Sequence, residues 1–387
     1  MVSSKKFEIR VALLGYVSVG KTTVLNAIFR DKFSEVSMKR TTAGINFFRV
    51  MKSEPLVKEE PDAKSASDDK KKRACTIPLV ATGSAKKAKT ANETLKEITA
   101  LNRELREARK IKEMWFDIEL DHDEPLCAMR DDTSLVLVDI PGINEADTDN
   151  IYMAYIQEHW GEFDCVIVVM DARQGVNTEE QVDLLKLVKD NLATKRRVPT
   201  IILFNKVDDP DEPEQASLVS EALVKVAEVF KIPGREKGLK KAVDSLTKKE
   251  PKPVSTTCPI FLATSANHAF FYRTASLLTF SQFKVKFGMD IINSIGKLEV
   301  GRHQWKKLNP EKKYTAVFEA VCEDSDYKER LEATNFDKFL KALSLCVGGE
   351  ESQLKVLHAQ VDFAIRSMDQ IQVSVQTLRS LYDKSVV

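Results

Sequence analysis

Short runs of consecutive apolar residues recur along most of the chain and predict the buried strands of a mostly parallel sheet. The expected strands lie at 8–14, 45–51, 115–120, 135–138, 166–169, 201–204 and 260–263. Between them, apolar residues recur every three or four positions, which is the spacing of amphipathic helices. These helical segments lie at 21–29, 92–108, 182–192 and 218–229. Strand and helix therefore alternate to about residue 290, which predicts a doubly wound α/β domain over 1–290.

The chain from 291 to 387 has no strand-like runs, and we expect a helical bundle or partial stalk there. Apolar residues within 351–383 are spaced alternately by three and four positions, which is an a/d heptad pattern. They are Leu354, Leu357, Val361, Ala364, Met368, Ile371, Val375, Leu378 and Tyr382. A helix of this kind can form a self-associating coiled coil or pack in a local bundle, and the local bundle is the favoured interpretation.

The segment 52–90 interrupts the α/β pattern, because it is rich in Pro, Ser, Ala and charged residues and has no apolar periodicity. Such a composition predicts a disordered insertion. Its basic run at 70–73 is typical of a solvated loop, with nuclear import or an anionic surface as the alternatives.

The charge balance excludes some classes of protein. Among the 387 residues, 59 Lys and Arg stand against 58 Asp and Glu, which gives a net charge of +1 and argues against a protein that coats nucleic acid. No apolar run approaches the roughly 18 residues of a membrane-spanning helix, and no signal peptide follows Met1. The six cysteines are scattered, so we expect a reducing, cytoplasmic location.

The first predicted strand runs into a G-x-x-x-x-G-K-T motif, which precedes a predicted helix. The motif comprises Gly15, Tyr16, Val17, Ser18, Val19, Gly20, Lys21 and Thr22, followed by Thr23. In this context the backbone N–H groups of the loop and the helix N-terminus can bind phosphate. Lys21 would bridge the β- and γ-phosphates, and the Thr22 hydroxyl would bind Mg²⁺.

Four further motifs follow in order, each next to a predicted strand. Arg40-Thr41-Thr42 offers a threonine for Mg²⁺ and the γ-phosphate, and Asp139-Ile140-Pro141-Gly142 offers a second magnesium ligand and an amide. Asp208 of Asn205-Lys206-Val207-Asp208 can accept both guanine N1–H and N2–H, a pair that adenine lacks. Ser265, Ala266 and Asn267 can meet the guanine oxygen. Together these motifs predict a GTP site with Thr22, Thr42 and Asp139 as its metal ligands.

The order GYVSVGKTT, TT, DIPG, NKVD, TSAN resembles that of the translation-factor-related GTPases and, within them, the dynamin superfamily. Ser18 in the loop, the charged helix and extra strand at 92–120, and the helical continuation carry the second resemblance. It implies a GTPase that hydrolyses GTP, self-associates through its GTPase face or its C-terminal helices and contacts a membrane peripherally. The helical part is shorter than a full stalk, and no lipid-binding domain is visible.

Hydrolysis needs a positioned water, and Ile143 occupies the position where Ras-like enzymes carry a glutamine. The resemblance implies that Ser18, Lys21, Gly142 and the backbone near Thr41 or Thr42 take over this role. A monovalent cation beside the loop, or Arg40, would supply further positive charge. The alternatives to this function are an Era-like GTPase acting in RNA modification or ribosome assembly, and a nucleotide-dependent scaffold that uses the heptads.

Overall fold

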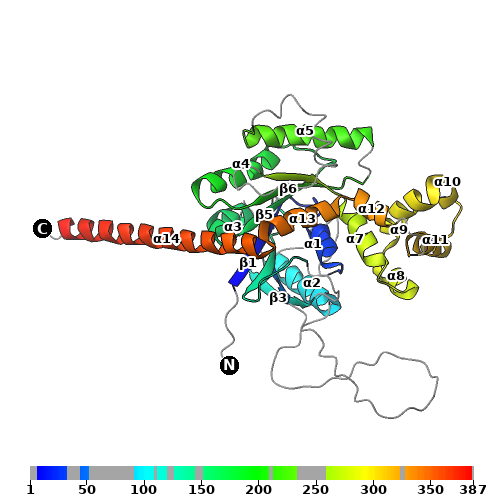
Figure 1. Cartoon of the computed structure of the whole chain (residues 1–387), viewed down its shortest axis with the longest axis horizontal. Coiled ribbons are helices and arrows are strands. Elements are labelled where there is room, and N and C mark those ends of the chain that lie inside the picture. Colours follow the sequence, from blue (N-terminus) through cyan, green and yellow to red (C-terminus); the bar gives the residue numbers. More distant parts are fainter. Residues whose placement is uncertain are drawn as a thin grey trace, which may run out of the picture.

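The computed structural model describes residues 7–32, 44–51, 91–108, 111–119, 126–143, 151–208, 212–232, 259–322 and 327–385. The predictions for the insertion at 52–90 and for Arg40, Thr41 and Thr42 lie outside these residues. Figure 1 shows the described helices and strands along the chain.

The strands form one seven-stranded sheet in the order β3-β2-β4-β1-β5-β6-β7. Their bounds are β1 Phe7–Leu14, β2 Ile45–Met51, β3 Glu113–Glu119, β4 Thr133–Asp139, β5 Cys165–Asp171, β6 Thr200–Asn205 and β7 Ile260–Ala263. All neighbours pair in parallel except β2 and β4. Strands β4, β5 and β6 are buried along their whole length, as expected for strands covered on both faces. The predicted mostly parallel α/β fold is confirmed.

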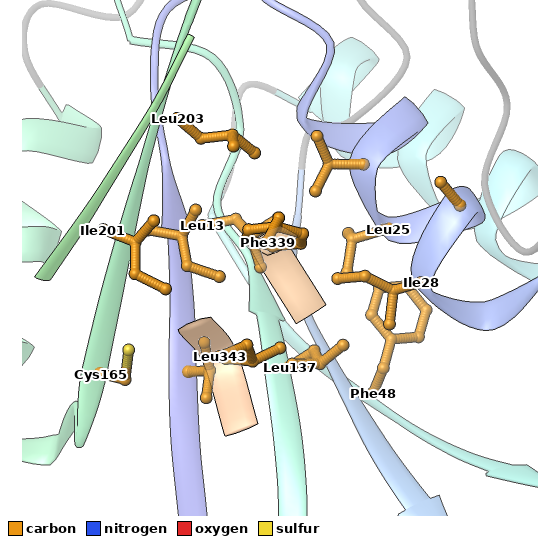
Figure 2. Close-up of a cluster of buried hydrophobic side chains, with 14 of the residues drawn as sticks. Leu13, Leu25, Ile28, Phe48, Leu137, Cys165, Ile201, Leu203, Phe339 and Leu343 are labelled. Atoms are coloured by element: carbon orange, nitrogen blue, oxygen red, sulfur yellow. The ribbon is translucent and has the colours of Figure 1, made fainter. Parts of the chain in front are cut away.

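One face of the sheet is covered mainly by four helices that share an apolar layer with it, to which Val356 near the C-terminus also belongs. They are α1 Lys21–Phe29, α2 Ala91–Ala108, α7 Ala266–Ala275 and α13 Phe336–Val347. Figure 2 shows Leu25 of α1 and Phe339 of α13 in this layer together with Leu13 of β1. This layer lies beneath the loop that follows β1, so it fixes the start of α1 relative to the sheet.

The other face of the sheet is covered by α3 Ile151–His159, α4 Glu179–Thr194 and α5 Pro213–Val229. Thr178 caps the start of α4: its hydroxyl accepts the Gln181 N–H, while the Gln181 side chain accepts the Thr178 N–H. This reciprocal cap satisfies two backbone donors at the helix start. Trp160 is fully buried in this layer.

The predicted boundary at residue 290 does not mark the end of the α/β core. Helix α13 lies well beyond it, yet Phe336, Phe339 and Leu343 are at most 1% exposed and pack in the same layer as β1. An amphipathic pattern identifies a buried helix face but not the surface that covers it. The α/β unit therefore takes a covering helix from the segment that the sequence assigns to a separate helical region.

A second, smaller apolar core holds the helices between α7 and α13. These elements are α8 Phe280–Lys286, α9 Met289–Gly296, η2 Lys297–Gly301, α10 Arg302–Trp305, α11 Pro310–Cys322 and α12 Tyr327–Ala333. Phe271, Phe283, Phe287 and Trp305 are at most 2% exposed there. Figure 1 shows α10 and α11 at the end of the molecule remote from the tip of the last helix.

The last helix, α14 Glu350–Ser385, is 36 residues long and projects from the body of the molecule (Figure 1). The predicted heptad helix is thus present. The local-bundle interpretation is wrong for its outer half, because Met368, Ile371 and Leu378 are 69%, 63% and 65% exposed. Among the described helices, none has the length and apolar character needed to cross a membrane.

Candidate nucleotide-binding site

The loop that follows β1 turns directly into α1 and carries the predicted phosphate-binding residues. Gly20, at the start of α1, has a φ of +96°, a left-handed conformation that costs glycine little. Ser18 also has a positive φ, +64°. The first turn of α1 contains no acidic residue, so its N–H groups and positive dipole end face the loop without a competing carboxylate. The local structure is that of an anion-binding helix N-terminus.

The side chain of Lys21 folds back over this loop. Its Nζ donates hydrogen bonds to the Gly15 oxygen at 2.9 Å and to the Tyr16 oxygen at 3.0 Å. The residue is 7% exposed, so the ammonium charge is held close to the loop backbone. Lys21, which the sequence predicts to bind phosphate, therefore lies against the backbone of the loop.

Gly142 brings the segment after β4 against the phosphate loop. A Cβ on Gly142 would lie 2.7 Å from Val17 Cα and 2.8 Å from Val17 N, so only glycine allows this approach. The next residue, Ile143, donates its N–H to the Gly15 oxygen at 3.3 Å and is 3% exposed. The structure thus places Gly142 beside the loop and turns Ile143 into the core.

Asp139 lies at the carboxyl end of β4, paired in register with Leu13 of β1, and is fully buried. Thr22 is half-buried in the first turn of α1. A hydroxyl and a carboxylate are the hard oxygen donors that Mg²⁺ prefers, and Mg²⁺ commonly takes few protein ligands. The described members of the predicted metal set, Thr22 and Asp139, therefore fit the ion in kind, while Thr42 lies outside the described residues.

Asn205 ties the phosphate loop to the loop that follows β7. Its Nδ2 donates to the Val19 oxygen at 3.0 Å, and its Oδ1 accepts the Ala266 N–H at 3.0 Å. A Cβ on Gly20 would lie 2.3 Å from the same Nδ2. The 2%-exposed Asn205 side chain therefore sets the spacing between two of the predicted binding segments.

Asp208 and Ser265 meet at the place where the base is expected. The Ser265 hydroxyl donates to Asp208 Oδ1 at 2.6 Å, which orients the carboxylate. Ser265 is 1% exposed and also caps α7, whereas Asn267 is exposed. The structure therefore brings the NKVD and TSAN motifs into contact.

The base loop has a support that the sequence did not reveal. The Thr334 carbonyl, just before α13, accepts the Thr264 hydroxyl at 2.7 Å and the Ser265 N–H at 3.2 Å. Thr334 is 5% exposed. No motif marks it, because the contact uses a backbone oxygen that any residue type would supply.

Lys206 joins the phosphate loop to Asp171, an acidic residue outside the sequence motifs. Its Nζ donates to the Ser18 oxygen and to Asp171 Oδ2, both at 2.5 Å. Asp171 is 3% exposed and ends β5. An acidic residue that closes an otherwise apolar run, Val168-Val169-Met170-Asp171, is a signal that could have identified it.

Tyr16 links the phosphate loop to the first turn of α4. Its hydroxyl donates to the Glu180 oxygen. Burial, together with the negative charges of Glu180 and Asp183, raises the pKa of Tyr16 well above its usual value. The phenol therefore stays neutral and keeps its proton for this hydrogen bond. Spacing alone could not assign a partner 164 residues away.

Within the described ranges, no group of three or more His, Cys, Asp and Glu side chains is placed to hold a metal ion. His268 is 3% exposed and its Nε2 lies 3.1 Å from the Ser294 hydroxyl. Burial lowers the pKa of His268, and the charge of Asp208 opposes this shift.

A phosphate loop at the carboxyl end of β1, with polar residues at the ends of β4, β5, β6 and β7, defines a P-loop nucleotide-binding protein. A model of the Dynamin family matches residues 11–207, which is just over half of the chain. The chain belongs to the Dynamin family. A search of curated proteins finds no match.

Matches among solved structures include two of an oligomerised bacterial dynamin pair, described in connection with long-range sensing and tethering of membranes. Each is 16% identical with a TM-score of 0.37, and the matches cover 98% and 99% of this chain but 47% and 57% of those chains. A crystal structure of Era with MgGDPNP and ribosomal RNA is 15% identical, with a TM-score of 0.31 and coverage of 67% and 52%. The chain thus spans about half the length of these structures, and the family assignment rests on the family model.

Proposed function

We propose that this chain binds GTP and hydrolyses it to GDP and phosphate. The observation that carries the proposal is the pairing of Asp208 with Ser265 at 2.6 Å, next to a loop whose Lys21 and helix N-terminus offer positive charge. A carboxylate held in this orientation can accept hydrogen bonds from both N1–H and N2–H of guanine, whereas adenine does not present this pair of donors. The phosphate loop alone does not determine which nucleotide base is bound.

The base assignment is tested with Asp208→Asn. The amide replaces one acceptor by a donor, so we expect weaker binding of GTP and stronger binding of xanthosine triphosphate. Titration of fluorescent nucleotides measures both affinities. Asp190→Asn is the matched control, since Asp190 is an exposed residue of α4. Unchanged GTP affinity in Asp208→Asn would show that the base is read elsewhere.

Lys21 and the N–H groups of the loop would hold the phosphates, and Thr22 and Asp139, with Thr42, would hold Mg²⁺. The ion, when bound, neutralises negative charge on the phosphate oxygens. Lys21→Ala should lower GTP affinity by about 100-fold or more, because it removes charge-assisted hydrogen bonds of about 1.5–3 kcal/mol each. Isothermal titration checks this loss, and Lys186→Ala on the surface of α4 is its control.

Hydrolysis would depend on pairing of two chains through their GTPase faces. Ile143 is buried in the core and its side chain has no hydrogen-bonding group, so it cannot orient the attacking water. Ser18, Gly142 and the segment with Thr41 and Thr42 would position the water once pairing excludes bulk solvent. A monovalent cation beside the loop is the further source of positive charge in this proposal.

The rate of GTP hydrolysis per chain should therefore rise with protein concentration, and GDP with aluminium fluoride should promote dimers that GDP alone does not. Ser18→Ala should reduce turnover far more than it weakens binding. Light scattering and a dilution series of the hydrolysis rate measure these effects. A flat rate together with a monomer in the presence of the mimic would favour a separate activating protein.

We also propose that the chain contacts a membrane surface peripherally. Exposed basic residues gather in the segment from η2 to the start of α11, namely Lys297, Arg302, Lys306, Lys307 and Lys312. The segment also holds two acidic residues: the Glu299 side chain is 7% exposed and pairs with Arg330, whereas Glu311 is exposed beside Lys312. With Leu298 44% exposed beside them, these charges suit anionic lipid headgroups.

Co-sedimentation with vesicles of anionic phospholipid tests the membrane contact. Lys306→Glu with Lys307→Glu should lower the bound fraction, and Lys186→Glu with Lys189→Glu on α4 is the control of equal charge change. Binding that does not change in the first variant would contradict this location. Stronger binding to structured RNA than to vesicles would favour the Era-like alternative.

A further inference from the structure

Asn46 is a buried polar residue near the start of β2, and none of the nucleotide-binding motifs contains it. It is fully buried, and neither its Nδ2 nor its Oδ1 has a hydrogen-bond partner among the described residues. A side-chain amide carries two donor hydrogens on its nitrogen and an acceptor oxygen. Buried polar groups without a partner are rare in native proteins. Asn46 therefore indicates a partner that the described chain itself does not supply.

Asp139 is the residue directly opposite Asn46. The antiparallel ladder between β2 and β4 pairs the two residues, and directly opposite residues have Cβ atoms about 4.5–5.5 Å apart. Phe48 and Leu137, two positions further along the same strands, lie in the apolar layer shared with α1 (Figure 2). Because side chains alternate between the two faces of a sheet, Asn46 and Asp139 lie on this same face. The unpaired amide is thus next to a predicted magnesium ligand.

The antiparallel direction of β2 brings Asn46 to the edge of the sheet that carries the phosphate loop. Asp139 ends β4, which runs parallel to β1 and therefore ends at the same edge as β1. Asn46 is the second residue of β2, which runs the other way, so its amino end meets the carboxyl end of β4. Asn46 therefore lies at the same end of the sheet as the residues predicted to bind phosphate and Mg²⁺.

The side of Asn46 away from Asp139 is apolar. There β2 pairs with β3, and Met114, 5% exposed, is the residue opposite Asn46. A thioether sulfur is only a weak acceptor. A water held by Asn46 and Asp139 alone would have two polar partners, whereas buried waters typically make about three hydrogen bonds. A cation beside Asp139 supplies the third interaction.

We propose that Asn46 is a further residue of the magnesium site, where it holds a water of the ion's hydration shell next to Asp139. The inference rests on the nucleotide binding proposed above. Mg²⁺ usually keeps several of its waters when it binds to a protein, and the hydrogens of these waters need acceptors. The Asn46 oxygen is such an acceptor, and its Nδ2 can donate to the Asp139 carboxylate and orient it. Asn46 is therefore a positioning residue, because it acts through a water and through a ligand residue.

The magnesium dependence of nucleotide binding by the full chain tests the proposal. The affinity for a fluorescent, non-hydrolysable GTP analogue is measured over a range of free Mg²⁺ concentrations. Asn46→Leu should raise the half-saturating Mg²⁺ concentration by about 10-fold or more, which is the usual effect of losing a residue that orients metal ligands. The affinity in excess chelator should stay the same, because the amide then has no ion-bound water to hold. Electron paramagnetic resonance of Mn²⁺ in place of Mg²⁺ should show the same loss of metal affinity.

Thermal unfolding without nucleotide and without Mg²⁺ separates this role from a structural one. Asn46→Leu should not lower the melting temperature, because it replaces an unpaired amide by an apolar side chain of similar shape. Asn46→Val, which is shorter, repeats the test with less risk of crowding in the core.

Asn191→Leu is the matched control. Asn191 is 3% exposed in α4, and its Nδ2 donates to the Leu187 oxygen at 2.9 Å. Because this amide has a partner within the chain, its loss should lower the melting temperature. The half-saturating Mg²⁺ concentration should stay unchanged, because α4 carries none of the predicted magnesium ligands.

Equal half-saturating Mg²⁺ concentrations for Asn46→Leu and the unaltered chain would overturn the proposal. A melting temperature that falls in Asn46→Leu and Asn46→Val as far as in Asn191→Leu would overturn it as well, since the amide would then have a partner within the chain alone. Equal affinity of the unaltered chain for GTP and ATP would contradict the proposed base recognition instead. The magnesium shift measured with ATP would then decide this inference.

Discussion

At the scale of single residues, the contact between Gly142 and Val17 couples the segment after β4 to the phosphate loop. The backbone of Val17 lies where a Cβ on Gly142 would be placed, within 2.7–2.8 Å. A methyl group there must displace backbone atoms, not a flexible side chain, so the loop itself would move.

We therefore expect Gly142→Ala to weaken GTP binding by about 10-fold or more, because the displaced loop no longer presents its N–H groups in register. Fluorescent nucleotide titration measures the affinity. Gly288→Ala is the matched control, since Gly288 has a φ of −76° and no atom within 4 Å of the added Cβ. Equal affinity in the two variants would show that the contact is not needed for binding.

His268 of α7 makes the stability of the chain depend on pH. Burial lowers its pKa in the folded chain below the unfolded value of about 6.5, so the neutral ring is favoured on folding. Its contribution to stability is complete above about pH 6.5 and decreases as the pH falls through that value toward the folded pKa.

Accordingly, the free energy of unfolding should fall less between about pH 8 and pH 5.5 in His268→Asn than in the unaltered chain. Urea unfolding at the two pH values gives this difference. His303→Asn, at an exposed position, should behave like the unaltered chain. An identical pH dependence in all three proteins would mean that other groups dominate.

Sequence motifs located Lys21, Asn205, Asp208 and Ser265, because each belongs to a short pattern next to a strand. They did not locate the contacts of Tyr16 with α4 or of Asp171 with Lys206, which join segments distant in sequence. Such contacts depend on which strand ends lie side by side, and β5 and β6 become neighbours only in the folded sheet.

At the scale of elements, polar side chains attach α14 to the body of the molecule. Removal of one of these side chains should lower the free energy of unfolding by a measurable amount. Gln353→Ala leaves the Arg130 N–H and the Ala128 oxygen without their amide partner in a buried place. We expect a loss of about 2 kcal/mol or more in unfolding free energy, measured by denaturant titration.

Gln370→Ala, on the exposed outer half of the same helix, is the control and should change stability by less than about 0.5 kcal/mol. If Gln353→Ala were equally neutral, the amide contacts would not be what holds α14 against the sheet.

The period of apolar residues predicted α14 as an element but indicated the wrong face for its docking. Hydrophobic spacing identifies Leu354, Val361 and Met368, whereas the body contacts Gln353 and Gln360. Buried amides leave no hydrophobic signal, so periodicity misses them. The sequence also did not predict the antiparallel pairing of β2 with β4, because the apolar pattern of a strand does not show whether its neighbour runs parallel or antiparallel.

At the scale of the whole molecule, the outer part of α14 is separable from the α/β core. Its residues from 368 to 379 are exposed and bury little apolar surface in the single chain. A chain that ends at Ser367 should keep its GTP affinity within about twofold and its melting temperature at low protein concentration within about 3 °C. Differential scanning calorimetry and nucleotide titration check both values.

The comparison variant carries an internal deletion of similar length that removes α13. It should lose cooperative unfolding, since Phe336, Phe339 and Leu343 belong to the core. If the short truncation had the same effect, the outer helix would be part of the folding unit. The sequence predicted the α/β and helical parts correctly in kind, but not that α13 belongs to the first.

The turns of α14 that contact the body of the molecule end near Phe363, which lies against Gly161, and about 22 further residues extend beyond them as a straight rod of about 33 Å. Because this rod is attached at one end only, a small change in its angle moves its free end over a distance that is proportional to its length. If the amino ends of β1 and β5 tilt by about 10° with Gln360 bonded to the Glu8 oxygen and Asp164 there, the far end of α14 is displaced by about 6 Å. Small rearrangements of the sheet would therefore move the tip of the helix by more than the axial length of one helical turn.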